Sequence, residues 1–383
     1  MDVLFIIKWV LCSTTLMYVG LITVFFISWM RMPTFTAKNV KPYTTMVSII
    51  IPARNEAENI GKCMGDIMQQ NYPLELMEII IVDDNSTDTT YNEALEFKNM
   101  HKNVNVKILS LKDNAAVNSY KKAAITTGIM EASGTLIITT DADCRYPNEW
   151  VKTIVEYQLE TNVVFISSPV CFIMEQTSFE KMQTLEFISL IGIGGAALNM
   201  GWPIVCNGAN ISFLKEAFMA VGGYNDNEAI ASGDDVYLML KMARKYPSLI
   251  RFLKTLDATV YTYPKATLHE FYQQRKRWAS KGTKYKDTKI TMVAIITYLA
   301  NLAWLINFIL AIVFHTLMPL FLIITLARMI VEVAFLSAVS VFFNRSQILM
   351  LYLPTFLFNV LYVVIMGVAG SIGGYVWKGR TVK

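Results

Sequence analysis

The chain has 383 residues, of which 54% are hydrophobic and only 17% are charged, and its formal net charge is +4. So small a charge gives no reason to expect a nucleic-acid partner. The hydrophobic excess suits a protein that is partly soluble and partly embedded in a membrane. The five cysteines are odd in number and show no CxxC spacing, which argues against a disulfide framework or a zinc site and favours a reducing compartment.

The first segment in chain order is predicted to be a membrane anchor. Residues 9–29 are apolar and uncharged, and Arg31 follows them. This length suffices to cross a bilayer, which takes about 20 residues. A cleaved signal peptide would have a shorter apolar core and a cleavage site of small residues. We therefore predict an uncleaved anchor over residues 1–31.

Residues 45–270 have the composition of a soluble domain, in which apolar runs alternate with polar segments of helical spacing. Helix-like spacing is found, for example, over residues 57–70 and 117–131. The runs predicted as strands are residues 47–51, 77–82, 104–110, 135–140 and 163–168. Strands that alternate with helices indicate an α/β fold whose parallel sheet is covered on both faces. Ligands of such sheets bind at the carboxyl ends of the strands.

A basic segment at residues 271–290 leads into a second apolar region, residues 291–383, for which about three spans are predicted. Residues 292–314 and 348–376 contain no charge, whereas residues 317–343 contain Arg328 and Glu332. These two lie four residues apart and therefore on one helix face. We expect them to pair with each other inside the protein rather than to serve in transport or a proton relay. A glycine-rich run at residues 190–205 is expected to form an amphipathic lining near the membrane.

Basic residues around the soluble domain predict that this domain lies in the cytosol. They are Arg31, Lys38, Lys41 and the basic run over residues 275–289. Three later spans would place the C-terminus outside, yet the tail at residues 377–383 is basic and favours the inside. The side of the C-terminus stays open, and we expect a multi-pass protein of the plasma membrane.

Polar and acidic residues follow three of the predicted strands. In chain order they are Pro52, Arg54, Asn55 and Glu56, then Asp83 and Asp84, then Asp141 and Asp143. Carboxylates that converge on one sheet edge repel each other unless a cation or a hydrogen-bond donor lies among them. A hard divalent ion that arrives with a phosphorylated substrate meets this need. Each group alone could be a turn, a loop or a helix cap; their common order and spacing are what indicate a site.

The sequence resembles a known family at this point. The stretches "VSIIIPARNEAENI", "EIIIVDDNSTDTT" and "KKAAITTGIMEASGTLIITTDADC" resemble the nucleotide-sugar half of family 2 glycosyltransferases with the GT-A (Rossmann-like) fold. "VCNGANISFLKEAFMAVGGYND", "SGDDVYLMLKM" and "QQRKRW" resemble the acceptor half of membrane-integrated members. That group includes hyaluronan, chitin, cellulose and poly-N-acetylglucosamine synthases and the ceramide glucosyltransferases. The resemblance covers roughly residues 47–286 and specifies neither sugar nor acceptor.

The resemblance implies roles for the strand-end residues in binding the donor. Asp84, with Asp83 beside it, would contact a uracil ring, while Glu56, Arg54 and the Pro52 loop would line the nucleoside. A further basic residue, Lys121, matches the family's GKxxAL element, although Tyr120 stands where the family has glycine.

Asp141 and Asp143 would be the family's DxD pair. Asp143 would ligate Mg²⁺ or Mn²⁺ on the donor diphosphate, and Asp141 would face the ribose and the metal. The resemblance thus implies that a buried strand ends in two carboxylates in order to hold a metal–diphosphate.

The resemblance also implies a catalytic base and an acceptor-side helix. Asp235 matches the second acid of the family's acidic pair and would deprotonate the acceptor hydroxyl, and Asp234 stands where many relatives have Glu. The plainer alternative for this pair is a helix cap with a first-turn acid. Gln274, Arg277 and Trp278 form a QxxRW motif that would bind diphosphate, acceptor sugar or lipid. The same segment could also be a basic interfacial helix that lies against anionic lipid.

The leading interpretation is a membrane-bound inverting glycosyltransferase that moves a sugar from a UDP-sugar to a lipid at the cytosolic membrane face. One alternative is a processive synthase that extends and exports a polysaccharide. An alternative of another class is a non-catalytic membrane scaffold with a domain that binds nucleotide-sugars. Membrane lipids are expected partners, nucleic acid is not, and a homo-oligomer is compatible with the sequence.

Overall fold

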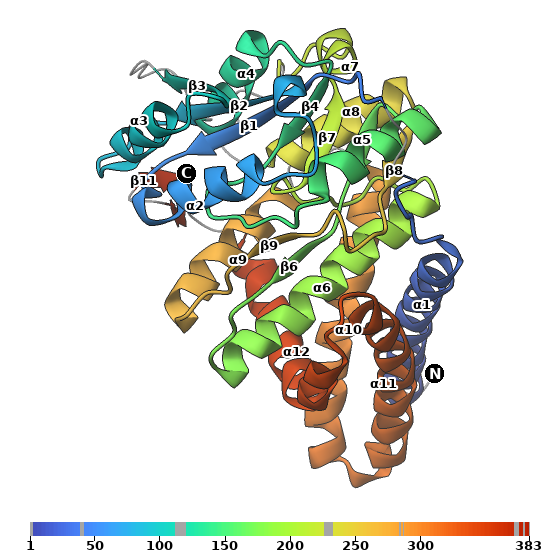
Figure 1. The fold of residues 1–383 in the computed structure, drawn as a ribbon. Coiled ribbons are helices and arrows are strands. Elements are labelled where there is room, and N and C mark those ends of the chain that lie inside the picture. The colour runs from blue at the N-terminus through green and yellow to red at the C-terminus, as the bar shows by residue number, and fades with distance from the viewer. Residues whose placement is uncertain are drawn as a thin grey trace.

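The computed structural model describes residues 3–38, 42–111, 120–225, 233–282, 285, 287–370, 375–377 and 380–382. An α/β domain occupies one end of the molecule, and long helices form a bundle at the other end (Figure 1). Helices α6 (Ser178–Asn199) and α9 (Leu268–Gly282) lie between the two parts. Residues 117–119 of the predicted helix over 117–131, and Lys41, lie outside the described residues.

A seven-stranded sheet with the order β3-β2-β1-β4-β7-β5-β8 forms the centre of the α/β domain. Its strands are β1 (Val47–Ala53), β2 (Met77–Asp83), β3 (Asn105–Ser110), β4 (Leu136–Thr139), β5 (Phe165–Ser167), β7 (Ile211–Leu214) and β8 (Ile250–Phe252). All five predicted runs contain strands, so the predicted α/β sheet is confirmed. The expectation of a wholly parallel sheet is wrong at β7, which is antiparallel to both β4 and β5.

The reversal at β7 has a consequence for the site. Ile211 pairs with Thr139, so β7 begins at the edge where β4 ends. The chain arrives there from α6, through the loop at residues 200–210, and enters the sheet from its carboxyl edge. Residues 206–210 therefore lie beside the residues that follow β4. The four-residue strand "ISFL" is too short and too mixed to be predicted by its pattern.

Helices cover the sheet through regular apolar faces. In α2 (Ala57–Met68), Ile60, Cys63, Met64 and Ile67 are buried at the spacing of one helix face. The other helices of the domain are α3 (Thr90–Met100), α4 (Tyr120–Glu131), α5 (Trp150–Thr161), α7 (Lys215–Ala220) and α8 (Asp234–Lys245), with a 3₁₀ turn at Leu74–Leu76. Two short pairs complete the strands: β6 (Val170–Phe172) with β9 (Val260–Thr262), and β10 (Tyr375–Trp377) with β11 (Arg380–Val382).

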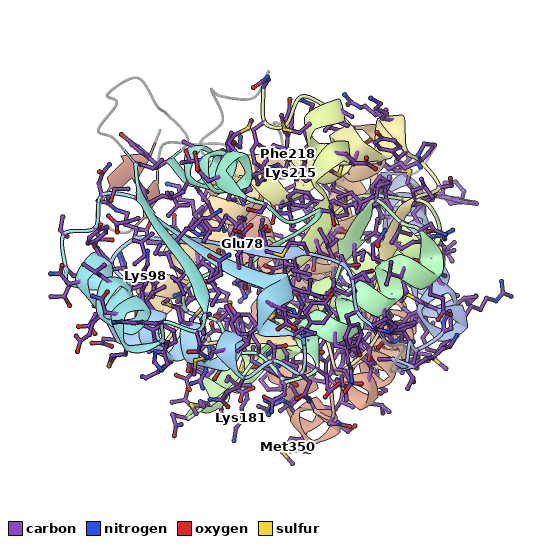
Figure 2. The ribbon with its side chains drawn as sticks, turned by 45° about the horizontal axis from the view of Figure 1, so that its top comes forward. Glu78, Lys98, Lys181, Lys215, Phe218 and Met350 are labelled. Carbon is purple, nitrogen blue, oxygen red and sulfur yellow. The ribbon has the colours of Figure 1, made fainter. Side chains whose placement is uncertain are left out.

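Four helices among the described residues are long and apolar enough to cross a membrane, one before the α/β domain and three after it. They are α1 (Val3–Arg31), α10 (Thr288–Val313), α11 (Met318–Phe342) and α12 (Tyr352–Ala369), with 3₁₀ turns at His315–Leu317 and Ser346–Leu351. Figure 2 shows Glu78 inside the sheet and Met350, which is 83% exposed, projecting from the end of the molecule opposite α4.

The predicted pairing of Arg328 with Glu332 is confirmed. Arg328 is buried and its Nη2 lies 3.0 Å from Glu332 Oε1. The hydroxyls of Tyr18 in α1 and Tyr352 in α12 each donate to Glu332 at 2.8 Å, and Arg328 Nη2 also donates to Asn301 Oδ1 in α10. The pair therefore joins all four apolar helices in one hydrogen-bonded network.

The glycine-rich run at residues 190–205 forms the second half of α6 and the loop after it, and most of α6 is buried. It packs against α1, α11, α12 and β8, so it is enclosed rather than amphipathic. A Cβ on Gly192 would lie 2.6 Å from the Val339 side chain, and one on Gly195 would lie 2.9 Å from Phe252. The glycines let α6 approach both the bundle and the sheet closely, which is why this stretch lacks a polar face.

Lys254, which follows β8, fastens the first apolar helix to the α/β domain. Its buried Nζ donates to the carbonyl oxygens of Trp29 at 2.8 Å and Met32 at 3.2 Å, at the C-terminal end of α1. It also lies 4.4 Å from the centre of the Trp29 ring. A cation at this end of a helix satisfies carbonyls that have no partner within the helix.

Candidate active site

The loops after β1 and β2 are tied together at the carboxyl edge of the sheet. Ala53 and Asp83 are in register at the ends of the two strands. Arg54 Nη1 donates to the carbonyl oxygens of Asp84 at 2.7 Å and Asn85 at 2.8 Å. Arg54 thus holds the loop that carries the two acids in a fixed position. Pro52 lies within β1, one residue before its end.

Asp83 and Asp84 are both buried. Asp83 Oδ2 accepts from the backbone N–H of Ser86 at 3.3 Å, whereas Asp83 Oδ1 is buried without a hydrogen-bond partner among the described residues. A buried acceptor without a partner is costly unless a ligand supplies a donor. This oxygen is therefore suited to accept an N–H group from a bound heterocycle.

Glu56 directly precedes α2 and connects it with α3. Its Oε2 accepts from Asn59 at 2.8 Å, and its backbone N–H donates to Thr90 Oγ1 at 2.7 Å. Glu56 lies at the same sheet edge as Arg54 and Asp84.

The turn after β4 presents Asp141 and Asp143, both partly exposed. Asp141 Oδ1 lies 2.6 Å from Lys121 Nζ, which comes from the first turn of α4. The Asp141 and Lys121 side chains are 36% and 21% exposed, so this ion pair is open to solvent and to ligands. The ammonium group provides the cation that the sequence requires among these carboxylates.

The residues of this turn fit a hard divalent ion that is shared with a substrate. Two carboxylates within three residues offer oxygen ligands of the type that Mg²⁺ and Mn²⁺ take. No group of three or more His, Cys, Asp or Glu side chains suited to a metal is found in the part of the chain that the structure describes. Asp141 and Asp143 would therefore need oxygens from a phosphate or from water to complete the coordination.

Lys121 also connects this turn with the acidic pair. Burial lowers the pKa of Lys121, but the charges of Asp141, Asp234 and Asp235 outweigh burial and raise it overall. Its neighbour Lys122 is more deeply buried, and burial together with the charge of Lys281 lowers its pKa to about 8. The DxD turn and the acidic pair are thus parts of one electrostatic site.

Asp234 and Asp235 are the first two residues of α8, and Gly233 before them has a φ of +84°. Asp235 Oδ2 accepts from the backbone N–H of Gly208 at 3.0 Å, and Oδ1 accepts from Val236 at 2.8 Å. The loop before β7 therefore lies in contact with the acid, and two N–H groups fix the direction of the Asp235 carboxylate.

Helix α9 carries the QxxRW motif. Some of its side chains contact α6, and others lie near the start of α8. Gln274 Oε1 accepts from Arg275 at 2.6 Å, and the Trp278 ring stacks on Phe187 of α6 with 6.0 Å between centres. Trp278 therefore contacts α6, and Gln274 contacts Arg275, whose partner Glu186 lies in α6. The charges of Arg277 and Asp235 both act on Lys281, one helical turn after Arg277.

Two residues that no motif of the sequence selects, Lys281 at the end of α9 and Tyr285 shortly after it, lie beside the acidic pair. Lys281 lies against the start of α8, because a Cβ on Gly233 would be 3.4 Å from its Cδ. The Tyr285 hydroxyl covers the same glycine, and it is buried without a hydrogen-bond partner among the described residues. Both stand in a basic stretch whose composition indicates a membrane surface, so only their contacts with Gly233 identify them.

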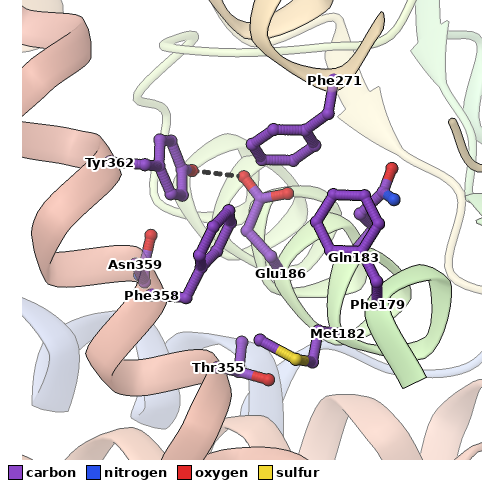
Figure 3. A pocket seen from close by; sticks show the side chains of 9 residues that line it. All are labelled: Phe179, Met182, Gln183, Glu186, Phe271, Thr355, Phe358, Asn359 and Tyr362. Carbon is purple, nitrogen blue, oxygen red and sulfur yellow. Dashed lines mark hydrogen bonds between the residues drawn. The ribbon is translucent and has the colours of Figure 1, made fainter. Parts of the chain in front are cut away.

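A separate pocket lies between α6, α9 and α12 (Figure 3). It is lined by Phe179, Met182, Gln183, Glu186, Phe271, Thr355, Phe358, Asn359 and Tyr362. Aromatic rings surround Glu186, whose Oε1 accepts from the Tyr362 hydroxyl at 2.6 Å. None of the acids after the strands lines this pocket, so it is distinct from the carboxyl edge of the sheet.

Comparison with known families identifies the class of protein to which this fold and site belong. Residues 48–222 match the description "Glycosyl transferase family 2", and residues 136–369 match "Glycosyl transferase family group 2". The second match covers more than half of the chain and includes α9 and most of the apolar C-terminal region. The chain belongs to this family of glycosyltransferases.

Named relatives include enzymes with several kinds of product. The chain is 34% identical over 151 residues to the glycosyltransferase AglE of Haloferax volcanii, covering 37% of this chain and 48% of that protein. It is 24% identical over 245 residues to the poly-beta-1,6-N-acetyl-D-glucosamine synthase of Staphylococcus epidermidis, covering 62% and 54%. It is 24% identical over 255 residues to the beta-monoglucosyldiacylglycerol synthase of Synechocystis sp., covering 64% and 50%. The chain thus spans about half the length of these relatives.

A solved structure shares the fold over nearly the whole chain. It is a mannosyltransferase from Pyrobaculum calidifontis in complex with GDP-mannose and Mn²⁺, with a TM-score of 0.59 and 18% identity. The alignment covers 95% of this chain and 98% of that one. The fold is therefore the GT-A fold that the sequence predicted, accompanied by apolar helices.

Proposed function

We propose that this glycosyltransferase is metal-dependent and inverting, and that it transfers one sugar from a UDP-sugar to a lipid at the cytosolic membrane face. The observation that carries the proposal is the position of Lys121. Its ammonium group pairs with Asp141 of the DxD turn and also interacts with the acidic pair at the start of α8. A donor diphosphate at the DxD turn and an acceptor hydroxyl at the acidic pair would therefore lie close enough to react.

The carboxyl edge of the sheet supplies the contacts that a UDP-sugar needs. Asp83 Oδ1 accepts a ring N–H of uracil, and Arg54 fixes the loop that carries Asp84 beside the base. Asp141 and Asp143 hold Mg²⁺ or Mn²⁺, which supplies positive charge to the leaving diphosphate when it is bound. Lys121, Arg277 and Lys281 add positive charge to the same region.

Asp235 acts as the general base. Its carboxylate takes the proton of the acceptor hydroxyl while the acceptor oxygen forms a bond to the anomeric carbon. The bond between that carbon and the diphosphate oxygen breaks, and UDP leaves with the electron pair. The backbone N–H groups of Gly208 and Val236 keep the carboxylate oriented through this step. Attack opposite the leaving group inverts the configuration at the anomeric carbon.

A lipid acceptor is favoured by the polar groups of the apolar helices. The Arg328–Glu332 pair is satisfied by Tyr18, Tyr352 and Asn301. A conduit for an exported glycan would need polar groups turned towards the sugar along its depth, because hydroxyls without partners are costly in hydrocarbon. The side chains of this network are turned towards one another. A single transfer at the membrane surface requires no such conduit.

We also propose the arrangement of the chain in the membrane. Residues 1–31 anchor the protein, residues 45–270 form the cytosolic catalytic domain, residues 271–290 form an interfacial segment that contains most of α9, and residues 291–383 span the membrane about three times. The basic residues beside the apolar helices support this orientation.

The test uses purified full-length protein in lipid vesicles with Mn²⁺ and a panel of radiolabelled UDP-sugars, with GDP-mannose included. One UDP-sugar is expected to label the lipid fraction and to release UDP in equal amount. Labelling from GDP-mannose alone would contradict the assignment of uracil to Asp83. If a UDP-sugar were consumed without labelled lipid, the proposed lipid acceptor would be wrong.

A further inference from the structure

We infer that Glu186 is a positioning residue, which holds Arg275 and thereby sets the rotation of the QxxRW helix beside the acidic pair. The inference rests on the proposed function, in which Asp235 is the base and α9 covers it. Glu186 lies in α6, far along the chain from the residues after the strands, and no motif includes it.

Glu186 joins three helices through its two oxygens. Oε2 forms an ion pair with Arg275 Nη2 of α9, and Oε1 accepts from Tyr362 of α12 at 2.6 Å (Figure 3). Both members of the ion pair are buried. A buried carboxylate with a cation and a hydroxyl as partners fixes its neighbours more firmly than an exposed pair does.

Arg275 is held on its faces as well as at its end. Its guanidinium lies 4.5 Å from the ring centre of Phe271 and 4.3 Å from that of Trp278, so it is stacked between two side chains of its own helix. The Trp278 ring in turn stacks on Phe187, the residue after Glu186. Residues 271, 275 and 278 share one helix face, and that face is attached to α6.

An adjoining face of α9 carries Arg277 and Lys281, which are four residues apart, and Lys281 lies against Gly233 at the start of α8. Because a helix is rigid, the rotation that seats Arg275 on Glu186 also determines where Arg277 and Lys281 point. Loss of the ion pair would remove this constraint on the rotation of α9. Glu186 therefore acts on the reaction through Arg275 and the orientation of α9.

The experiment measures kcat, the KM for the lipid acceptor and the Kd for the donor in vesicles. Glu186→Gln keeps the shape of the side chain and removes its charge. We expect kcat to fall roughly 10- to 100-fold, the cost of a displacement of about 1 Å at a reacting centre. The Kd for the UDP-sugar is expected to stay within about twofold, because the DxD turn and the loops after β1 and β2 are untouched.

Repeating the Glu186→Gln substitution in an Arg277→Ala variant distinguishes a positioning role from a general structural role. If Glu186 acts by placing Arg277, then Glu186→Gln should add little to the loss already caused by Arg277→Ala. Equal losses in both backgrounds would overturn the inference. Should Glu186→Gln fail to fold, Tyr362→Phe removes one hydrogen bond only, and its kcat should fall roughly two- to tenfold; an unchanged kcat would also overturn it.

A matched control is available at another contact between the domain and the apolar helices. Glu175 lies 3.7 Å from Arg345, and both residues lie outside α9. Glu175→Gln should leave kcat unchanged, whereas a loss equal to that of Glu186→Gln would show that any weakened junction lowers activity. If wild-type protein labels no lipid with any donor, the proposed function fails; if it is active and Glu186→Gln matches it, only the inference fails.

Discussion

The Asp235→Asn variant probes the proposed general base, and its effect on structure can be worked out separately from its effect on chemistry. Both Asp235 oxygens accept backbone N–H groups, from Gly208 at 3.0 Å and from Val236 at 2.8 Å. Asparagine has one oxygen and one NH₂ group, so one of these N–H groups would face another donor. The substitution therefore has a structural cost as well as removing the base.

The structural cost is small compared with the expected kinetic effect. Loss of one hydrogen bond to a charged acceptor costs about 1.5–3 kcal/mol, and the lower end applies because Asp235 is partly exposed. A domain with a stability of about 5–15 kcal/mol stays folded after such a loss. Loss of a general base lowers the rate by roughly 10² to 10⁴. The kinetic loss thus cannot be explained by unfolding.

The assay follows transfer, donor binding and the melting temperature in detergent. Asp235→Asn should bind the UDP-sugar with nearly wild-type affinity, melt a few degrees lower and transfer sugar at least about 100-fold more slowly. Asp287→Asn is the matched control, since only Oδ1 of Asp287 accepts from the first N–H groups of α10 and asparagine keeps that oxygen. Transfer by Asp235→Asn at a near wild-type rate would refute the assignment and make Asp234 the next candidate.

Three further outcomes are expected. A chelator should abolish UDP release and Mn²⁺ or Mg²⁺ should restore it if, as proposed, Asp141 and Asp143 hold the diphosphate through a cation; full activity in metal-free buffer would rule this out. Burial lowers the pKa of Lys122 from 10.5 to about 8, so the unfolded chain binds more protons between these values and stability rises with pH across that range, by at most about 3 kcal/mol. Melting temperatures from pH 7 to 10 should show a smaller rise for Lys122→Met than for wild type, and identical curves would contradict the burial of the charge. Lys254→Met leaves two α1 carbonyls without their donor and should destabilise the protein by about 1–3 kcal/mol, whereas Lys181→Met, at an exposed site in α6, should not change its melting temperature.

Much of the fold could be predicted because the relevant patterns are local. The runs that became β1 and β2 are continuous and apolar, since central parallel strands are buried on both faces. The apolar helices are identified by length alone. By contrast, β7 has four residues, and its antiparallel direction depends on where α6 returns the chain. The burial of Gly192 and Gly195 likewise depends on which partners α6 meets.

The candidate site likewise contains residues that could be predicted from the sequence and residues that could not. Residues that follow strands, such as Asp84 and Asp141, could be selected because parallel strands bring their carboxyl ends to one edge. Lys281 and Tyr285 could not, because they meet the start of α8 only through tertiary contacts with Gly233. Arg275 looked like one more surface cation in a basic stretch, whereas the structure buries it on Glu186. The spacing of residues along the chain predicts which of them share a helix face. It does not predict which other element packs against that face.

The most direct measurement is the size of the product that wild-type protein makes in lipid vesicles with its UDP-sugar. The product is extracted, separated by mass and treated with glycanases. We expect a single new glycolipid one sugar heavier than its acceptor, with UDP released in equal amount. A ladder or a high-molecular-mass polymer that a specific glycanase degrades would contradict single transfer and would establish a processive synthase instead.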